Sequence, residues 1–350
     1  MMKSKTYIAT PPGATIKEQL IDRGMSQKEF AQRMDMSEKH ISKLINGEVQ
    51  LTPDVAMRLE MVLGLPARFW SNLEAIYREK LQLVQAENEM EQDIAIMKKY
   101  PYREMAKYGW VLDVKKAEEK VFSLRKHFEV VRLTMLKAPL IPGIAYRRQS
   151  TSDKAECALL AWAQRAKIEA RQIETRPIDL QKLEKIIPEI RTMTSANPEE
   201  FCPKLIEMLA ECGIALVFLP HIGGSFLHGA TFYDRNKIVV GLTVRGKDAD
   251  KFWFSLFHEL GHILKGHISN FEGTTDEDEQ EADSYARQTL IADADFDQFA
   301  KAGQFNVETM QGFARKEGID VGILVGRLQK EGYIQYSWFN ELKTKYELTS

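Results

Sequence analysis

Three histidines and a glutamate stand close together in an otherwise mostly apolar stretch, SLFHELGHILKGH, residues 255–267. Burying such polar groups costs free energy unless they find partners. His258 and His262 are four residues apart, so on a helix they lie on one face, one turn above the other. Two imidazoles at this spacing can bind one metal ion. Glu259 lies about 100° around the same helix, where it can reach a water on that metal without being a ligand.

The H-E-x-x-H pattern formed by these residues is typical of zinc peptidases. Zinc lowers the pKa of a bound water to roughly 7, so that hydroxide forms at neutral pH. Glu259 would take the proton of that water and later pass it to the leaving amine. We therefore expect Zn2+ as the cofactor. The competing interpretation is a buried helix with two hydrogen-bonded core histidines.

A catalytic zinc site usually has three protein ligands and one water, so a third ligand is needed. We expect Glu281 to be this ligand, because DEDEQEADSYARQTL predicts a second helix whose carboxylate could complete a His₂Glu set. Glu279 is a weaker alternative. His267 is five residues past His262, which is about 140° off the ligand face unless Gly266 breaks the helix.

Three other residues could assist this site. Asp283 could orient a ligating histidine through a hydrogen bond, or could simply face solvent. The oxyanion of a tetrahedral intermediate needs an electrophile. Tyr285 is our candidate, because it is one turn past Glu281 on the same face, although core packing is an equal alternative. His228 is the other candidate for this role.

Three short segments ahead of the histidine helix read as β-strands: ALVFLP (215–220), LHGATFY (227–233) and KIVVGLT (237–243). The segment DRNK joins the last two as a hairpin turn. The helix DADKFWFSLFHELGHILKGH follows. An exposed edge strand of such a sheet can hold an extended peptide by main-chain pairing across the metal.

The first eighty residues predict a bundle of five short helices. Thr15–Arg23 forms the first, and Ser26 caps the second with Glu29 at the capping-box position. Ser37 caps the third helix, EKHISKLIN, and the segments PDVAMRLEMVLG and LPARFWSNLEAIY supply the fourth and fifth. Two capped helices joined by a tight turn indicate a helix-turn-helix. The expected core residues are Phe30, Ala31, Met34, Ile41, Leu44 and Ile45.

On this model the third helix enters the major groove of DNA, and helix starts hold phosphates. The competing interpretation is a plain helical bundle with a solvated polar face. The expected DNA-binding residues are Gln27, Ser37, Lys39, His40, Ser42, Lys43 and Asn46.

Composition limits the remaining possibilities. The 350 residues are 44% hydrophobic and 28% charged, which is typical of a globular protein of two or three domains. A net charge of −2 means that DNA binding must be local. Three cysteines without C-x-x-C spacing favour a reducing cytosol over a disulfide framework. Neither a signal-peptide core nor a run of 18 apolar residues is present, so we expect a cytoplasmic protein with no membrane partner.

Two stretches also resemble known families. Residues 10–80 resemble the helix-turn-helix of the HigA antitoxin family, within the XRE repressor group, through PPGATIKEQLIDRGMSQKEFAQRM, MSEKHISKLING, LTPDVAMRLEMVLGLPARFW and NLEAIY. This resemblance implies operator binding, usually as a dimer. Residues from about 150 onward resemble the ImmA/IrrE family of zinc metallopeptidases, through HGATF, DKFWFSLFHELGH, EQEADSYA and LVGRLQKEGYIQYS. In that family the glutamate before A-D or A-N is the third ligand, which implies Glu281, and the peptidase cleaves a helix-turn-helix repressor.

We therefore expect a mainly α fold with a small β-sheet (α+β). It comprises a five-helix DNA-binding bundle in residues 1–80, a helical linker in 81–148, and a zincin-like metallopeptidase domain with a helical extension in 149–350. The expected function is that of a DNA-binding transcriptional regulator with a zinc-dependent endopeptidase, linked to a toxin–antitoxin module or mobile element. Expected partners are operator DNA, a repressor or antitoxin as protein substrate, a toxin and a second copy of the chain. The alternative is a non-enzymatic antitoxin or repressor whose zinc fold senses a ligand or binds a toxin.

Overall fold

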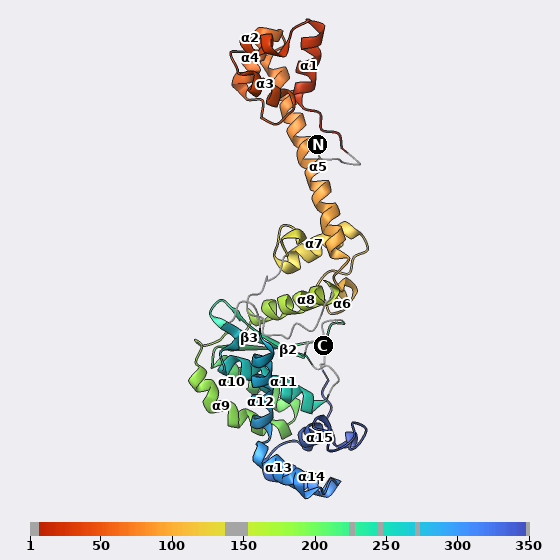
Figure 1. The fold of residues 1–350 in the computed structure, drawn as a ribbon, viewed down its shortest axis with the longest axis vertical. Helices are drawn as coiled ribbons and strands as arrows, with labels where there is room; N and C mark the ends of the chain where they lie inside the picture. The colour runs from red at the N-terminus through yellow and green to blue at the C-terminus, as the bar shows by residue number, and fades with distance from the viewer. Residues whose placement is uncertain (1–6, 137–152, 224–227, 244–247, 270–273, 348–350) are drawn as a thin grey trace. The chain divides into compact units, whose positions relative to one another are not determined.

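The computed structural model describes residues 7–136, 153–223, 228–243, 248–269 and 274–347. These residues form two compact units, which divide between Ala95 and Ile96 and are described separately below (Figure 1). Helices make up most of both units, and the second unit also contains one three-stranded sheet, so the expected fold class is confirmed. None of the described helices combines the length and the apolar composition needed to cross a membrane. The three cysteines are free.

The elements of the first unit follow the expected order. Its helices are α1 (Pro12–Asp22), α2 (Gln27–Arg33), α3 (Glu38–Ile45), α4 (Pro53–Leu63) and most of α5 (Ala67–Met97).

The second unit alternates helices with a small sheet. Its longer elements are α6 (Tyr102–Lys107), α7 (Ala117–Phe128), α8 (Asp153–Ala170), α9 (Leu180–Thr192), α10 (Pro198–Ala210), β1 (Ile214–Leu219), β2 (Gly229–Asp234), β3 (Lys237–Thr243), α11 (Ala249–Leu264), α12 (Asp276–Leu290), α13 (Asp293–Ala302), α14 (Val307–Glu317) and α15 (Val321–Lys330). Short 3₁₀ helices occur at Leu133–Met135, Met193–Ser195, His267–Ser269 and Asn340–Leu342.

Local capping explains where the helices of the first unit begin. The hydroxyl of Ser26 accepts a hydrogen bond from the Glu29 amide at 3.2 Å, and Ser37 does the same for the third helix. These bonds satisfy amides that have no partner inside a helix. The expected capping box is only half formed, because the carboxylate of Glu29 pairs with Arg33 at 2.6 Å instead. The helix α1 begins at Pro12, ahead of the expected start, because proline suits a first helical position.

The core of the first unit contains five of the six residues expected from the sequence, while Ile45 is only partly buried against it. The fifth helix continues well past residue 80, with neither glycine nor proline between Ala67 and Met97 to end it. The structural division therefore falls at Ala95, and the expected start of a third segment at residue 149 lies outside the described residues.

The sheet of the second unit has the order β1-β3-β2, with β1 parallel and β2 antiparallel to β3. Arg235 and Asn236 form the turn between β2 and β3, and Arg235 adopts a positive φ of 58°. Both outer strands are edge strands of this sheet, which leaves one side of β2 without a described strand partner.

Helices cover both faces of this sheet, with α8 on one face and α10 and α11 on the other (Figure 1). On the first face the indole of Trp162 reaches Gly241 so closely that a Cβ there would lie 2.5 Å from the ring. On the opposite face Ile238, Val240 and Leu242 join the main core with α11. Because side chains alternate along a strand, every second residue of β2 faces α11 and the others face α8.

Residues 344–346 form hydrogen bonds that hold the beginning of α11 in place. The amide of Ala249 donates to the carbonyl of Thr344 at 2.9 Å. The indole of Trp253 donates to the hydroxyl of Tyr346 at 3.0 Å, inside the core. The helix that carries both histidines is therefore held from the sheet side and from residues nearly a hundred positions later.

Candidate metal centre

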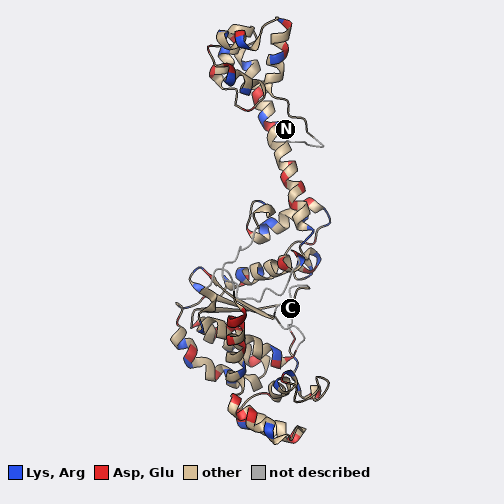
Figure 2. Ribbon diagram, in the orientation of Figure 1, with Lys and Arg blue, Asp and Glu red and all other residues tan. Residues whose placement is uncertain are grey.

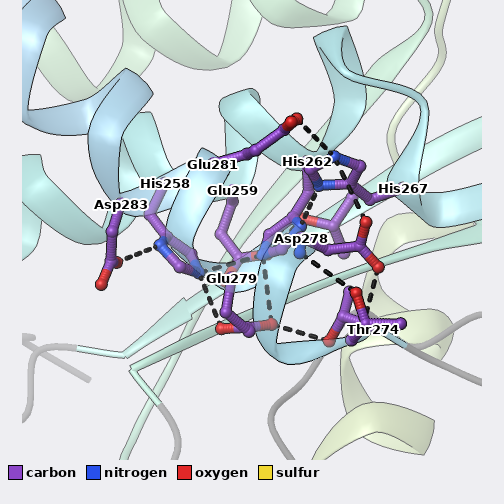
Figure 3. A network of polar contacts seen from close by, with 11 residues as sticks. His258, Glu259, His262, His267, Thr274, Asp278, Glu279, Glu281 and Asp283 are labelled. Carbon is purple, nitrogen blue, oxygen red and sulfur yellow. Dashed lines mark hydrogen bonds and ion pairs between the residues drawn. The ribbon is translucent and has the colours of Figure 1, made fainter.

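The helix α11 positions His258, Glu259 and His262, and α12 crosses close to it. A Cβ at Gly261 would lie 3.3 Å from the Cα of Ala282, so glycine is what lets α12 approach. The first turn of α12 contains four consecutive acidic residues, from Asp276 to Glu279. Figure 2 shows this acidic end of α12, and Figure 3 shows how its side chains meet the histidines.

Three donor atoms come together at this crossing. The Nε2 atoms of His258 and His262 are 3.0 Å apart. The carboxylate of Glu279 lies 3.5 Å from the first and 3.4 Å from the second. A tetrahedral zinc ion with bonds of about 2.0–2.1 Å separates its ligand atoms by about 3.3 Å. The three side chains therefore fit a zinc ion. Among the described residues, these three side chains form a group close enough together to hold a metal ion.

The carboxylate of Glu279 is held in place from behind. Thr274 donates a hydrogen bond to its Oε1 at 2.7 Å. Burial favours the neutral acid, but hydrogen bonds from His258 and Thr274 outweigh it and lower the pKa of Glu279. This residue is therefore a charged acceptor, as a metal ligand must be.

His258 has the carboxylate partner that the sequence suggested. Its Nδ1 lies 2.8 Å from Oδ1 of Asp283, which leaves Nε2 facing the other two donor atoms. Burial disfavours the charged ring, but hydrogen bonds to Asp283 and Glu279 raise the pKa of His258 to about 10. The imidazole must lose this proton before it binds a metal.

His262 has a different partner, which depends on how α11 ends. Gly266 adopts a φ of +80° and breaks the helix, so that His267 turns back toward His262. The Nδ1 atoms of the two rings lie 3.0 Å apart. Burial and the charge of His258 lower the pKa of His262.

The structure does not bring Glu281 to the histidine pair, contrary to our expectation for the third ligand. Its Oε2 lies 3.4 Å from Nε2 of His267, and 53% of its side chain is exposed. Glu281 is two residues after Glu279 and therefore about 200° further around α12. The position that we had assigned to Glu281 is taken by Glu279.

Glu259 lies beside the three donor atoms and is only 4% exposed. Thr231 on β2 donates a hydrogen bond to its Oε2 at 2.5 Å. A Cβ at Gly229 would lie 2.7 Å from Oε1, so this glycine gives the carboxylate its space. Burial raises the pKa of Glu259 to about 7, against the opposing effects of the His258 charge and the Thr231 hydrogen bond.

Sequence reasoning missed both Thr231 and Gly229. A signal was available, because residues two apart on a strand face the same side, and both belong to the quoted segment HGATF. Tyr285 and His228 were the two candidates for oxyanion stabilisation. Tyr285 packs on Gly261, its hydroxyl interacts with Thr289, and burial raises its pKa. His228 is exposed just before β2.

The expected DNA-binding residues lie on α2 and α3 and are mostly exposed. Gln27, Ser37, Lys39, Lys43 and Asn46 are exposed, whereas His40 and Ser42 are partly buried. The Ser37 hydroxyl is occupied by the helix cap, and Nε2 of His40 is buried without a hydrogen-bond partner within the described part of the chain. Lys39 and Lys43 are one turn apart and form the cationic part of this surface.

Comparisons with known proteins concern this first unit. A family model described as helix-turn-helix matches residues 16–70. The uncharacterized HTH-type transcriptional regulator YddM of Escherichia coli K12 is 36% identical over 63 residues, which cover 18% of this chain and 67% of that protein. A crystal structure described as an antidote protein of a plasmid maintenance system from Nostoc punctiforme is 32% identical over 25% of this chain and 92% of its own, with a TM-score of 0.23. Through its first unit, the chain belongs to the helix-turn-helix family of transcriptional regulators.

Proposed function

We propose that the chain is a DNA-binding transcriptional regulator whose second unit is a zinc-dependent endopeptidase for a specific regulatory protein. One observation carries the enzymatic part of this proposal. The Nε2 atoms of His258 and His262 lie 3.0 Å apart, and the two carboxylate oxygens of Glu279 lie 3.5 Å from the first and 3.4 Å from the second, which suits a zinc site with a buried glutamate next to it. A purely structural zinc site has no need of such a glutamate.

The residues that would hold the ion are His258 and His262 through Nε2, and Glu279 through its carboxylate. When bound, zinc would supply a Lewis acid that polarises a peptide carbonyl and lowers the pKa of a bound water. Glu259 acts as the general base that accepts a proton from the attacking water and returns it to the leaving amine. Burial of Glu259 raises its pKa, which supports this role because a desolvated carboxylate takes up a proton more readily than an exposed one.

The environment of Glu259 supports this role. Thr231 occupies Oε2, so Oε1 remains for proton transfer. The missing side chain at Gly229 keeps the strand backbone close to that oxygen. Both residues come from β2, so the strand and the base form one side of the same centre.

The free edge of β2 suits an extended peptide as the substrate. The amide of Thr243 donates to the carbonyl of His228, which makes these two a hydrogen-bonded pair of the antiparallel ladder. Such pairs alternate along the strands, so the main-chain groups of Gly229, Thr231 and Tyr233 point away from β3. A peptide that pairs with this edge would pass alongside Glu259.

The first unit supports the regulatory part of the proposal. In helix-turn-helix proteins the second helix of the motif enters the major groove, which here is α3. Its lysines, Lys39 and Lys43, would contact phosphates or bases of an operator, and a second copy of the chain would bind the other half-site.

The test combines metal content with cleavage. We expect elemental mass spectrometry to find about one zinc per chain in the wild type, and a proteome-derived peptide library to acquire new termini. Glu259→Gln should keep the zinc and lose cleavage, while Glu199→Gln, an exposed glutamate of α10, should change neither.

Two results would contradict the enzymatic proposal. A wild type that takes up no zinc when zinc is added would leave a DNA-binding regulator without a metal centre. A wild type that binds zinc and cleaves no peptide or protein would favour the non-enzymatic alternative, in which the zinc fold binds a ligand or a toxin.

A further inference from the structure

We propose that His267, hydrogen-bonded to His262 and facing the carboxylates of Glu281 and Asp278, forms a relay behind His262 that fixes which ring nitrogen of His262 faces the metal. This inference rests on the metal centre proposed above. It gives Glu281 the role of a positioning residue rather than a ligand.

The first step follows from the ring of His262 itself. Its Nε2 faces His258 and Glu279, so a bound metal would take that nitrogen. A neutral imidazole with an unprotonated Nε2 carries its proton on Nδ1. That N–H needs an acceptor, because the ring is 1% exposed. The atom at hydrogen-bonding distance is Nδ1 of His267, at 3.0 Å.

The second step concerns the proton of His267. If its Nδ1 accepts from His262, its own proton must be on Nε2. That nitrogen faces two carboxylates, Glu281 at 3.4 Å and Asp278 at 3.6 Å, while the ring is 8% exposed. The order of donors is therefore His262, then His267, then a carboxylate (Figure 3). Any other placement of the two protons leaves a buried N–H against an N–H or a lone pair against a lone pair.

The two carboxylates are not equivalent. Asp278 already has a structural task, because its Oδ2 accepts the Thr275 amide at 2.8 Å in the capping box of α12. Glu281 has no such task, and most of its side chain is in solvent. The contact with His267 therefore best explains the position of Glu281. Substitution of Glu281 should leave the fold intact.

With the relay, each of the two histidines is linked to a carboxylate through its Nδ1, but the two links are built differently. His258 reaches its carboxylate, Asp283, directly at 2.8 Å. On its Nδ1 side, His262 reaches a carboxylate through the ring of His267, because the turn at Gly266 places that ring between them. Partners of this kind fix the orientation of a ligating histidine and raise its basicity, and their loss typically costs 10–100-fold in metal affinity.

The test measures zinc affinity by competition with a chromophoric chelator. We expect His267→Leu to weaken zinc binding by about 10–100-fold and Glu281→Gln to weaken it less. His267→Gln should restore affinity close to the wild type, since an amide can both accept from His262 and donate to Glu281. A role in packing alone would show the reverse order, with leucine tolerated better. Glu277→Gln, an exposed neighbour on α12, is the matched control and should have no effect.

The visible spectrum of the cobalt-substituted protein separates positioning from ligation. We expect Glu281→Gln to leave the ligand-field bands unchanged and Glu279→Gln to alter them, because only Glu279 is a ligand in this scheme. Altered bands in Glu281→Gln would make Glu281 a ligand and overturn the relay. Unchanged affinity in all three relay variants, in a wild type that binds zinc, would overturn the relay alone. A wild type without zinc affinity would remove the proposed function as well.

Discussion

Replacing Gly229 by alanine should damage catalysis while leaving the fold and the metal in place. An ideal Cβ at this position lies 2.7 Å from Oε1 of Glu259, whereas ordinary contact begins at 3.4 Å. Cγ and Cδ of Glu259 would also be close, at 2.9 and 3.0 Å, so the whole side chain must retreat, by about 0.7 Å at Oε1 (3.4 minus 2.7 Å).

The size of the effect follows from that displacement. A misplacement of about 1 Å in a reacting group can cost about 100-fold in rate, so we expect a loss of about 30–100-fold in kcat/KM. Glu259 is nearly fully buried and fixed by Thr231, which leaves it no alternative position of similar geometry. Alanine in a strand is otherwise favoured over glycine by about 0.5–1 kcal/mol, so the free energy of unfolding should change little.

The assay is zinc-dependent cleavage of the peptide library, with zinc content and thermal unfolding measured on the same samples. Gly312→Ala is the matched control, because it makes the same chemical change inside α14, where nothing lies within 4 Å of the new methyl group. Full activity in Gly229→Ala would refute the argument that Glu259 is the base held against this strand. Loss of zinc would instead mean that the methyl group disturbs the ligands.

Three further predictions concern metal, pH and DNA. Removing zinc from a site saturated at about 100 times its Kd should lower the free energy of unfolding by about 2.7 kcal/mol. In calorimetry this loss lowers the melting temperature of the second unit by about 5–10 °C and leaves that of the first unit unchanged. Equal melting temperatures with and without chelator would contradict a zinc site in the folded state. Burial lowers the pKa of His127 from 6.5 to about 4, so its contribution to stability is complete above pH 6.5 and is lost as the pH falls toward 4. Between pH 7 and 4.5, urea unfolding should show a loss of stability that is about 2.5 kcal/mol larger in the wild type than in His127→Gln, and an equal loss in both would exclude His127 as a source. Replacing Lys39 and Lys43 with alanine should lower the slope of log affinity against log salt on duplex DNA by about 2, and an unchanged slope would place the DNA on another surface.

The sequence predicts best those features that depend on neighbouring residues. Ser26 and Ser37 predict where helices begin, because a helix cap acts over three residues. His258 and His262 lie on one face through helix geometry alone. The three strands could be placed within one or two residues because alternation and turn residues are local as well. The half-formed capping box was not predicted, because Glu29 has two partners within reach, the Ser26 amide and Arg33 one turn away, and the local pattern does not rank them.

The proposed third ligand was harder to predict, because its identity depends on the rotation of α12 against α11. Glu279 lies three and seven residues before Ala282 and Ala286, which are fully buried against α11, so helical periodicity placed it on the packed face. Glu281 does not share that stripe. The resemblance to a family directed attention to the residue next to A-D, and the hydrophobic pattern of this helix would have corrected it. The partnership of His267 with His262 could not be deduced, because it depends on the φ of Gly266.

The fastening of α11 by residues 344–346 has a consequence for the order of events during synthesis. The first unit is complete after about a hundred residues, and its contacts are close in sequence, so it can fold while the ribosome is still translating the rest. The helix with both histidines gains its contacts with Thr344 and Tyr346 only when those residues have also emerged. A nascent chain therefore acquires a folded helix-turn-helix before the helix of the proposed metal site gains these contacts, and any proteolytic capacity matures later than the capacity to bind DNA.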